Sequence, residues 1–161
     1  MFPNTFDSII MPLPHETDTI CLGKNLACIL KRGDCLALSG DLGSGKSFLA
    51  RAIIRYLKQN EALEVLSPTF TLVQIYESKI PIAHFDFYRL SNPKDFFELG
   101  FDDLLNEGIC IVEWPDLGKQ FLPRNRIRIQ LDYEKTGRKA TVLAEKEIIN
   151  HLYSISSLNR K

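Results

Sequence analysis

The sequence predicts a three-layer α/β domain, in which helices flank both faces of a central, mostly parallel sheet and an antiparallel hairpin is added near the C-terminus. Two observations predict this class. Short apolar runs, such as 34–39 and 108–114, alternate with amphipathic segments, as buried strands alternate with crossover helices. The run 34–39 leads through a glycine-rich turn directly into the helix-patterned segment 46–59.

Length and charge set limits on what the chain does. Its 161 residues favour a single domain with a sizeable core. Twenty basic and twenty acidic residues balance, so no overall field attracts nucleic acid or a membrane. The four cysteines form no CxxC pair and are expected to be small core residues, and no stretch reaches membrane-spanning length. With no signal-peptide pattern at the N-terminus, a cytoplasmic location is expected.

The first third of the chain contains one helix before the glycine-rich turn. An apolar segment at 8–13 is followed by a helix within 16–33, with Thr17 or Thr19 as the possible N-cap and Gly33 at its end. The run 34–39 is the first buried strand, and 46–59 is the helix that follows the turn.

The remainder of the chain predicts two hairpins separated by helices and a buried strand. Segments 69–77 and 80–88 are strands joined by a turn, and 93–105 is a helix broken at Gly100. The run 108–114 is a buried strand. Segments 125–133 and 138–145 form the C-terminal hairpin, and a short helix over 145–154 precedes a few loose polar residues.

The glycine-rich turn fits the pattern G-x-x-x-x-G-K-[ST], which binds phosphates. Its glycines turn backbone N–H groups inward, and the following helix adds its positive N-terminal end. The lysine would reach the β- and γ-phosphates, and the serine hydroxyl would bind Mg²⁺. The predicted fold is therefore that of the P-loop NTPases, and the predicted nucleotide-binding residues are Gly40, Asp41, Leu42, Gly43, Ser44, Gly45, Lys46, Ser47 and Phe48.

A phosphate loop also needs a carboxylate from the end of a neighbouring buried strand. Asp86 ends one apolar run and Glu113 ends another. Four apolar residues before Glu113 favour it as the acid on or next to magnesium, and Asp86 then orients the attacking water or binds the metal through water. The alternative for each is a solvated or salt-bridged carboxylate at a strand end.

Other features of the site are less specific. The guanine motif N-K-x-D is absent, because Pro93 makes 92–95 a helix start, so adenine is the better prediction. The hydroxyl-rich loop 67–71 closes over the γ-phosphate or is a capped turn. Trp114 contacts a partner or covers the end of the sheet.

Four motifs in this order, GDLGSGKS, SPTFTLVQIY, HFDFYRL and VEWP, resemble the TsaE (YjeE) family of bacterial ATPases. The T-x-x-L-G segment at 19–23 and DYEKTGR at 132–138 resemble it too, so the likeness covers about residues 10–144. The resemblance implies a part in forming threonylcarbamoyladenosine next to the anticodon of tRNAs that read codons starting with A. It implies ATP and Mg²⁺ as cofactors and TsaB and TsaD as partners. TsaD would transfer the threonylcarbamoyl group, and tRNA would be met only through that complex.

The resemblance also implies roles for individual residues. Lys46 would bind phosphate, Ser47 and Glu113 would hold Mg²⁺, and Asp86 would serve ATP hydrolysis, itself on or near the metal. It further implies a switch-like loop at Thr69, an adenine contact at Thr19, the family's tryptophan at Trp114 and a contact to nucleotide or partner at Arg138. Two positions depart from the family: Ser47, where threonine is more common, and Phe87, where leucine is.

Two other functions remain open. A small-molecule or nucleotide kinase would need an arginine-bearing lid, for which 124–128 is the only cluster, and its alternation is typical of a strand with a solvated face. A nucleotide sensor without turnover would need the same phosphate loop. Phosphoryl transfer to an added acceptor would favour the first, and nucleotide binding without hydrolysis the second.

Overall fold

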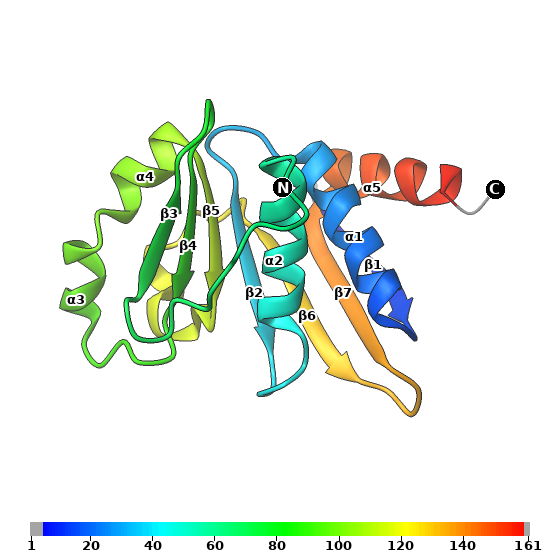
Figure 1. Cartoon of the computed structure of the whole chain (residues 1–161), viewed down its shortest axis with the longest axis horizontal. Helices are drawn as coiled ribbons and strands as arrows, with labels where there is room; N and C mark the ends of the chain where they lie inside the picture. The colour runs from blue at the N-terminus through cyan, green and yellow to red at the C-terminus, as the bar shows by residue number, and fades with distance from the viewer. Residues whose placement is uncertain (1–4, 160–161) are drawn as a thin grey trace.

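The computed structural model describes residues 5–159 and confirms the predicted α/β class (Figure 1). Every strand and helix predicted from 34 onward is present, with ends shifted by a few residues. The elements in chain order are β1 (Phe6–Leu13), α1 (Glu16–Ile29), β2 (Cys35–Gly40), α2 (Lys46–Leu57), β3 (Val73–Tyr76), β4 (Ile82–Asp86), α3 (Pro93–Glu98), α4 (Phe101–Glu107), β5 (Ile109–Glu113), the 3-10 helix η1 (Pro115–Phe121), β6 (Ile127–Tyr133), β7 (Arg138–Glu145) and α5 (Lys146–Leu158).

The strands form one mixed sheet in the order β1-β7-β6-β2-β5-β4-β3. Within residues 5–159, three pairings are parallel, and they join β6, β2, β5 and β4 at the centre. The other three are antiparallel: β3 with β4 at one edge, and β1 with β7 and β7 with β6 at the other. Because the central strands are parallel, the carboxyl ends of β2, β5 and β4 meet at one edge, where ligands bind in open α/β sheets.

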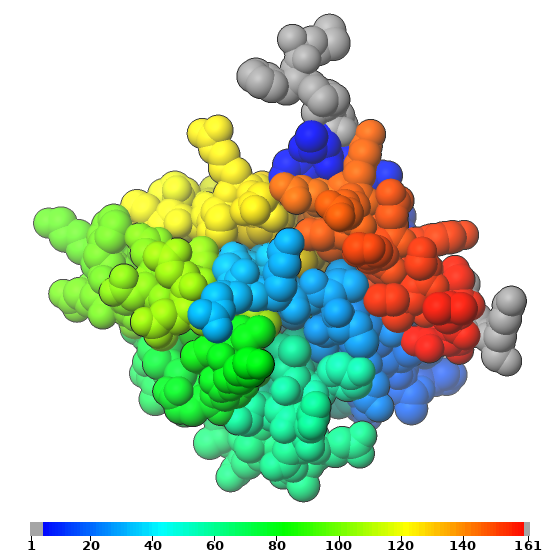
Figure 2. All heavy atoms as spheres, turned by 90° about the horizontal axis from the view of Figure 1, so that it is seen from above, coloured from blue at the N-terminus to red at the C-terminus, as the bar shows by residue number. Residues whose placement is uncertain are grey.

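Helices cover both faces of the sheet, so the three-layer arrangement is as predicted. Alternate side chains of each buried strand point to opposite faces. Leu36 and Leu38 of β2 belong to the core under α1, α2 and α5, while Cys35 and Ala37 belong to the core under α3, α4 and η1. Seen from above, the segment containing α3 and α4 and the helix α5 lie at opposite ends of the molecule (Figure 2).

The N-terminal part differs most from expectation. The apolar segment before the prolines is a full strand, β1, paired along its length with β7. Helix α1 begins at Glu16 with His15 as its N-cap, so the predicted caps Thr17 and Thr19 are wrong. The cause is Asp18, whose Oδ2 accepts the His15 N–H at 2.8 Å and fixes the start earlier. Gly33 lies beyond the helix end, where Leu30 is the C-cap.

The C-terminal hairpin is confirmed, with Glu134 N–H donating to the Gly137 carbonyl at 3.2 Å across its turn. Of the predicted basic face, Arg124 is exposed but Arg126 and Arg128 are half-buried. The last helix extends to Leu158, and the rest of the predicted loose end, 160–161, lies outside the described residues. In the described part of the chain, 5–159, every helix is too short or too polar to cross a membrane.

Candidate functional site

The phosphate loop lies between β2 and α2, as the motif predicts. Gly40 ends the strand at a φ of 148°, and a Cβ there would meet the Leu131 carbonyl oxygen at 2.5 Å, so only glycine fits. The helix begins at Lys46 with Gly45 as its N-cap and no side-chain cap. The first turn of α2 therefore presents free N–H groups and its positive end to the site.

Lys46 is folded back over its own loop. Its Nζ donates to the carbonyl oxygens of Gly40 at 2.7 Å and Asp41 at 2.9 Å, and only 4% of the residue is exposed. Burial lowers the pKa of the Lys46 ammonium, while Glu113, Asp86 and Asp41 act against that decrease. The ammonium is thus held at the base of the loop by groups that a phosphate could replace.

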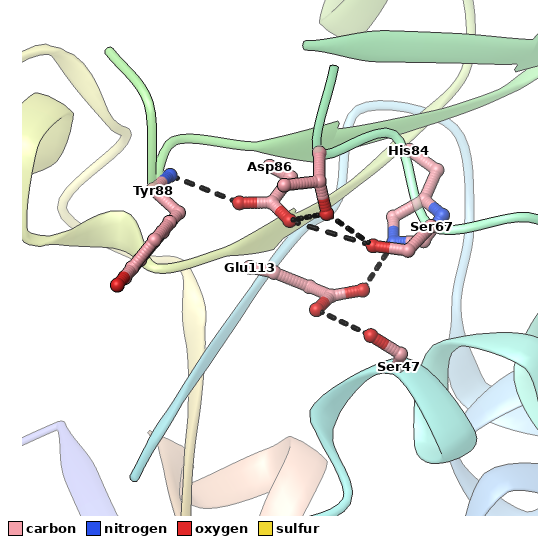
Figure 3. A network of polar contacts seen from close by, with 7 residues as sticks. Ser47, Ser67, His84, Asp86, Tyr88 and Glu113 are labelled. Carbon is pink, nitrogen blue, oxygen red and sulfur yellow. Dashed lines mark hydrogen bonds and ion pairs between the residues drawn. The ribbon is translucent and has the colours of Figure 1, made fainter. Parts of the chain in front are cut away.

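Glu113, the last residue of β5, is held by two side chains (Figure 3). Ser47 Oγ donates to Oε2 at 2.8 Å, and His84 Nε2 lies 2.7 Å from Oε1. Glu113 is 2% exposed and His84 1%. Because a buried carboxylate is costly without hydrogen bonds, these two contacts account for its position.

Asp86 ends the neighbouring strand β4 and faces Glu113 in the sheet register. Its carboxylate is held by the loop 67–71 and by the chain that follows it. Thr69 Oγ1 donates to Oδ2 at 3.1 Å, and the Tyr88 N–H donates to Oδ1 at 2.9 Å. Ser67 Oγ is 3.5 Å from the same Oδ2 and 2.9 Å from Thr69 Oγ1. The predicted hydroxyl-rich loop therefore lies beside the predicted water-orienting acid.

Trp114 follows Glu113 in a left-handed conformation, with φ 53° and ψ 57°, which is rare for a large residue. This turn places its ring against Lys46, whose Nζ is 3.9 Å from the ring centroid. The Tyr88 ring lies 4.9 Å from it, centroid to centroid. The ring is thus part of the site and packs on its ammonium group.

The C-terminal hairpin holds the outer side of the phosphate loop. Tyr133 OH donates to the Leu42 carbonyl at 2.7 Å, and Arg138 donates to the Gly43 carbonyl at 3.2 Å. The Arg138 guanidinium also lies 4.3 Å from the centroid of the Tyr133 ring. Arg138 therefore contacts the backbone of the loop itself.

Most of the predicted residues meet in one hollow of about 280 Å³. It is lined by Leu42, Gly43, Gly45, Lys46, Ser47, Phe48, Ser67, Thr69, Asp86, Tyr88, Glu113 and Trp114. The remaining predicted residues lie outside this lining. Gly40 and Asp41 accept from Lys46, Ser44 is buried in the loop, Thr19 is buried in α1, and Arg138 donates to the loop from outside. Their roles toward a nucleotide stay predictions.

A larger hollow, of about 690 Å³, lies between α1 and α2. It shares only Phe48 with the predicted site, and its charged residues are Lys24, Arg51, Arg55 and Glu61. Since it contains neither the phosphate-loop glycines nor the strand-end acids, the smaller hollow is the candidate site.

Sequence reasoning missed His84, Tyr88 and Tyr133. The signal for His84 was present, because it is a polar residue in the middle of the buried run of β4 and such a residue needs a partner. Tyr88 acts through its backbone N–H, which donates to Asp86 two residues earlier and leaves no mark in the side-chain pattern. Tyr133 acts through a hydroxyl that reaches the distant phosphate loop, and local pattern does not reveal such a contact.

The residues present fit Mg²⁺. Mg²⁺ prefers oxygen ligands, and Ser47 Oγ and Glu113 Oε2 are two such oxygens that lie side by side at the start of α2. Across residues 5–159, no group of three acidic, histidine or cysteine side chains gathers as a metal site. The protein would thus supply two oxygens, and phosphates and water the rest, as is usual for Mg²⁺ on nucleotides.

Comparison with known proteins gives one consistent family. The family described as "Threonylcarbamoyl adenosine biosynthesis protein TsaE" matches residues 13–141. Proteins named tRNA threonylcarbamoyladenosine biosynthesis protein TsaE from several bacteria are similar to this chain. The one from Rickettsia conorii is 41% identical over 121 residues, which cover 74% of this chain and 69% of that protein. The one from Haemophilus influenzae is 32% identical over 158 residues, covering 94% and 99%.

A solved structure shares the whole architecture. The crystal structure of Bacillus subtilis YdiB superposes with a TM-score of 0.72 and 26% identity, covering 96% of each chain. The fold is thus the P-loop NTPase-like fold that the glycine-rich motif predicts. Because the family match extends from Leu13 to Thr141 and includes the loop and both strand-end acids, this chain belongs to the TsaE family.

Proposed function

We propose that this protein is a Mg²⁺-dependent ATPase acting in tRNA threonylcarbamoyladenosine biosynthesis. The observation that carries the proposal is the 2.8 Å contact between Ser47 Oγ and Glu113 Oε2 at the N-terminus of α2. P-loop NTPases bind Mg²⁺ between such a hydroxyl and such an acid. ATP is the proposed nucleotide because the guanine motif is absent.

Each residue has a defined task in this proposal. Mg²⁺ held by Ser47 and Glu113 would supply charge neutralisation at the β- and γ-phosphates. Lys46 would exchange the carbonyl oxygens of Gly40 and Asp41 for phosphate oxygens, keeping its hydrogen bonds while gaining an opposite charge. The N–H groups of the loop and of the first turn of α2 would bind the remaining phosphate oxygens.

Asp86 would position the attacking water. Its carboxylate is buried, lines the same hollow and is held by Thr69 and the Tyr88 N–H, so its direction is fixed. Loop 67–71 would then sense the γ-phosphate, because a shift of Thr69 on closing over it changes the hydrogen bond to Asp86.

The proposed partners are the two proteins that the family resemblance implies. TsaB and TsaD would bind this ATPase in the cytoplasm, and TsaD would perform the transfer to tRNA. In this proposal, hydrolysis resets the complex for another turnover, and tRNA is met only through it.

The test is ATP hydrolysis with Mg²⁺, by the protein alone and then with TsaB, TsaD and tRNA. We expect slow turnover alone, faster turnover with the partners, and none with Glu113→Ala. Glu134→Ala is the matched control, because Glu134 is exposed and pairs with Lys139 in the hairpin. Wild-type turnover by Glu113→Ala would contradict the metal assignment.

The same experiment separates the two alternatives. A sensor would bind ATP and show no hydrolysis in either mixture. A kinase would transfer phosphate to an added small acceptor, and its turnover would not change when TsaB and TsaD are added.

A further inference from the structure

His84 is a buried side chain that the proposed mechanism does not yet use. It lies on β4 two residues before Asp86, so both side chains point to the α2 face of the sheet. Its Nε2 lies 2.7 Å from Glu113 Oε1, with 1% of the histidine and 2% of the glutamate exposed. Two polar groups that are both excluded from water are stable only where they hydrogen-bond to each other.

The contacts of Glu113 indicate which nitrogen of His84 acts as the donor. Ser47 Oγ donates to Oε2, and a carboxylate can only accept hydrogen bonds, so the contact at its other oxygen also calls for a donor. His84 Nε2–H is that donor, because no other group within residues 5–159 bonds Oε1. His84 Nδ1 is buried and finds no hydrogen-bond partner among the described residues, so Glu113 is the partner that orients the ring.

The two oxygens of Glu113 therefore have different environments. Oε1 contacts Nε2 of the buried His84, and Oε2 contacts the hydroxyl of the phosphate-loop residue Ser47 (Figure 3). A carboxylate held by one oxygen presents the other in a fixed direction, whereas a free one rotates about its last bond.

We propose that His84 is a positioning residue that holds Glu113 so that Oε2 is presented to Mg²⁺ beside Ser47 Oγ. The proposal rests on the proposed magnesium site at Ser47 and Glu113. His84 touches neither metal nor nucleotide in it, and its effect is on how tightly Mg²⁺ binds rather than on how tightly the nucleotide alone binds.

Two substitutions separate this role from simple space filling. His84→Leu fills similar volume without a donor. His84→Gln carries an N–H at the end of a side chain of similar reach, which restores a donor to Oε1. His151→Gln is the control, because His151 is exposed on α5.

The readout is the fluorescence of Trp114, the only tryptophan, which directly follows Glu113 and packs against Lys46. Mg²⁺ is titrated into each protein saturated with ADP, and ADP affinity is measured separately in EDTA. We expect His84→Leu to need about 10- to 100-fold more Mg²⁺, with ADP affinity in EDTA unchanged. His84→Gln and His151→Gln should remain close to wild type.

The proposal would be overturned if His84→Leu needed no more Mg²⁺ than wild type. It would also be overturned if His84→Gln needed as much additional Mg²⁺ as His84→Leu. If His84→Leu no longer binds ADP in EDTA, the test depends on His84→Gln alone. A Mg²⁺ requirement of His84→Gln equal to that of wild type would support the role of His84. A higher Mg²⁺ requirement of His84→Gln would overturn it. If Mg²⁺ does not change the Trp114 fluorescence of the wild-type ADP complex, the result would instead contradict the proposed magnesium site.

Discussion

Asp86 and Glu113 face each other in the register of the parallel strands β4 and β5, yet different parts of the chain hold their carboxylates. Glu113 is bound by the phosphate-loop serine, and Asp86 by the threonine of loop 67–71. The two acids therefore respond to different events. A change in the phosphate loop reaches Glu113 first, and a movement of loop 67–71 reaches Asp86 first.

Thr69→Val should slow hydrolysis without weakening nucleotide binding. Valine keeps the volume of threonine but removes the hydroxyl that donates to Asp86 Oδ2 at 3.1 Å. A hydrogen bond to a charged group contributes ~1.5 kcal/mol or more, so turnover should fall about 10-fold. Single-turnover hydrolysis and binding of a fluorescent ATP analogue measure the two effects. Thr69→Ser should stay near wild type, and full turnover in Thr69→Val would contradict the role of this contact.

Tyr133→Phe should loosen the phosphate loop from outside. It removes the 2.7 Å hydrogen bond from the hydroxyl to the Leu42 carbonyl while keeping the ring under Arg138. We expect a loss of about 1 kcal/mol in the free energy of unfolding and weaker nucleotide binding. Chemical denaturation and nucleotide titration give the two values. Tyr153→Phe, on the exposed side of α5, should change neither, and equal effects of both variants would be evidence against the contact.

Gly137→Ala should be more destabilising than Gly33→Ala, although both glycines have positive φ values, 79° and 91°. Left-handed strain costs each about 1–2 kcal/mol. At Gly137 the added Cβ would also meet the Leu13 carbonyl oxygen at 2.4 Å, whereas at Gly33 nothing lies within 4 Å. That contact should add about 2 kcal/mol. Urea unfolding measures the difference, and equal losses would show that the turn does not pack against the β1–α1 junction.

Two of the four cysteines should react with iodoacetamide in the native protein. Cys35 and Cys110 are buried as expected, but Cys21 and Cys28 are exposed on α1, so the expectation that all four are core residues is wrong for these two. Burial raises the pKa of the Cys35 thiol from 9.0 to about 12, which removes the reactive thiolate. We expect two labels by mass spectrometry at pH 8.5 and four after denaturation. Rapid native labelling of Cys35 would contradict its burial.

The same shift predicts a dependence of stability on pH. The raised pKa of Cys35 means that folding favours the neutral thiol, so its contribution is complete below pH 9 and declines as pH rises toward 12. One thiol contributes about 1.4 kcal/mol per pH unit in that window. Cys35→Ala lacks this thiol, so its free energy of unfolding should fall less than that of wild type between pH 8 and 10.5. Parallel urea titrations at the two pH values measure the difference.

Elements with a strong local pattern could be predicted from the sequence. The phosphate loop, its helix and the alternation of β6 and β7 each depend on residues that are neighbours in the chain. Strand β1 could not be assigned in the same way, because its pairing with β7 joins opposite ends of the sequence. The start of α1 differs from the predicted one because Asp18, three residues after the N-cap His15, accepts the His15 N–H and sets it.

The site shows the same division. Lys46, Ser47, Asp86 and Glu113 follow from a motif and from strand ends, and ten of the predicted residues do line one hollow. His84 could be seen as a polar residue in an apolar strand, but its partner lies on another strand. The contact of Arg138 with the Gly43 carbonyl depends on how the hairpin meets the loop, which only the fold defines.

The position of the hairpin also bears on how the protein matures during synthesis. Domains generally fold as units during synthesis, and the phosphate loop of this domain receives the contacts of Tyr133 and Arg138 from a segment that is made much later than the loop itself. A nascent chain that ends before β7 would carry the complete motif without the contacts that brace it. We therefore expect the proposed nucleotide binding to be acquired only after β6 and β7 have been made and have paired in the sheet.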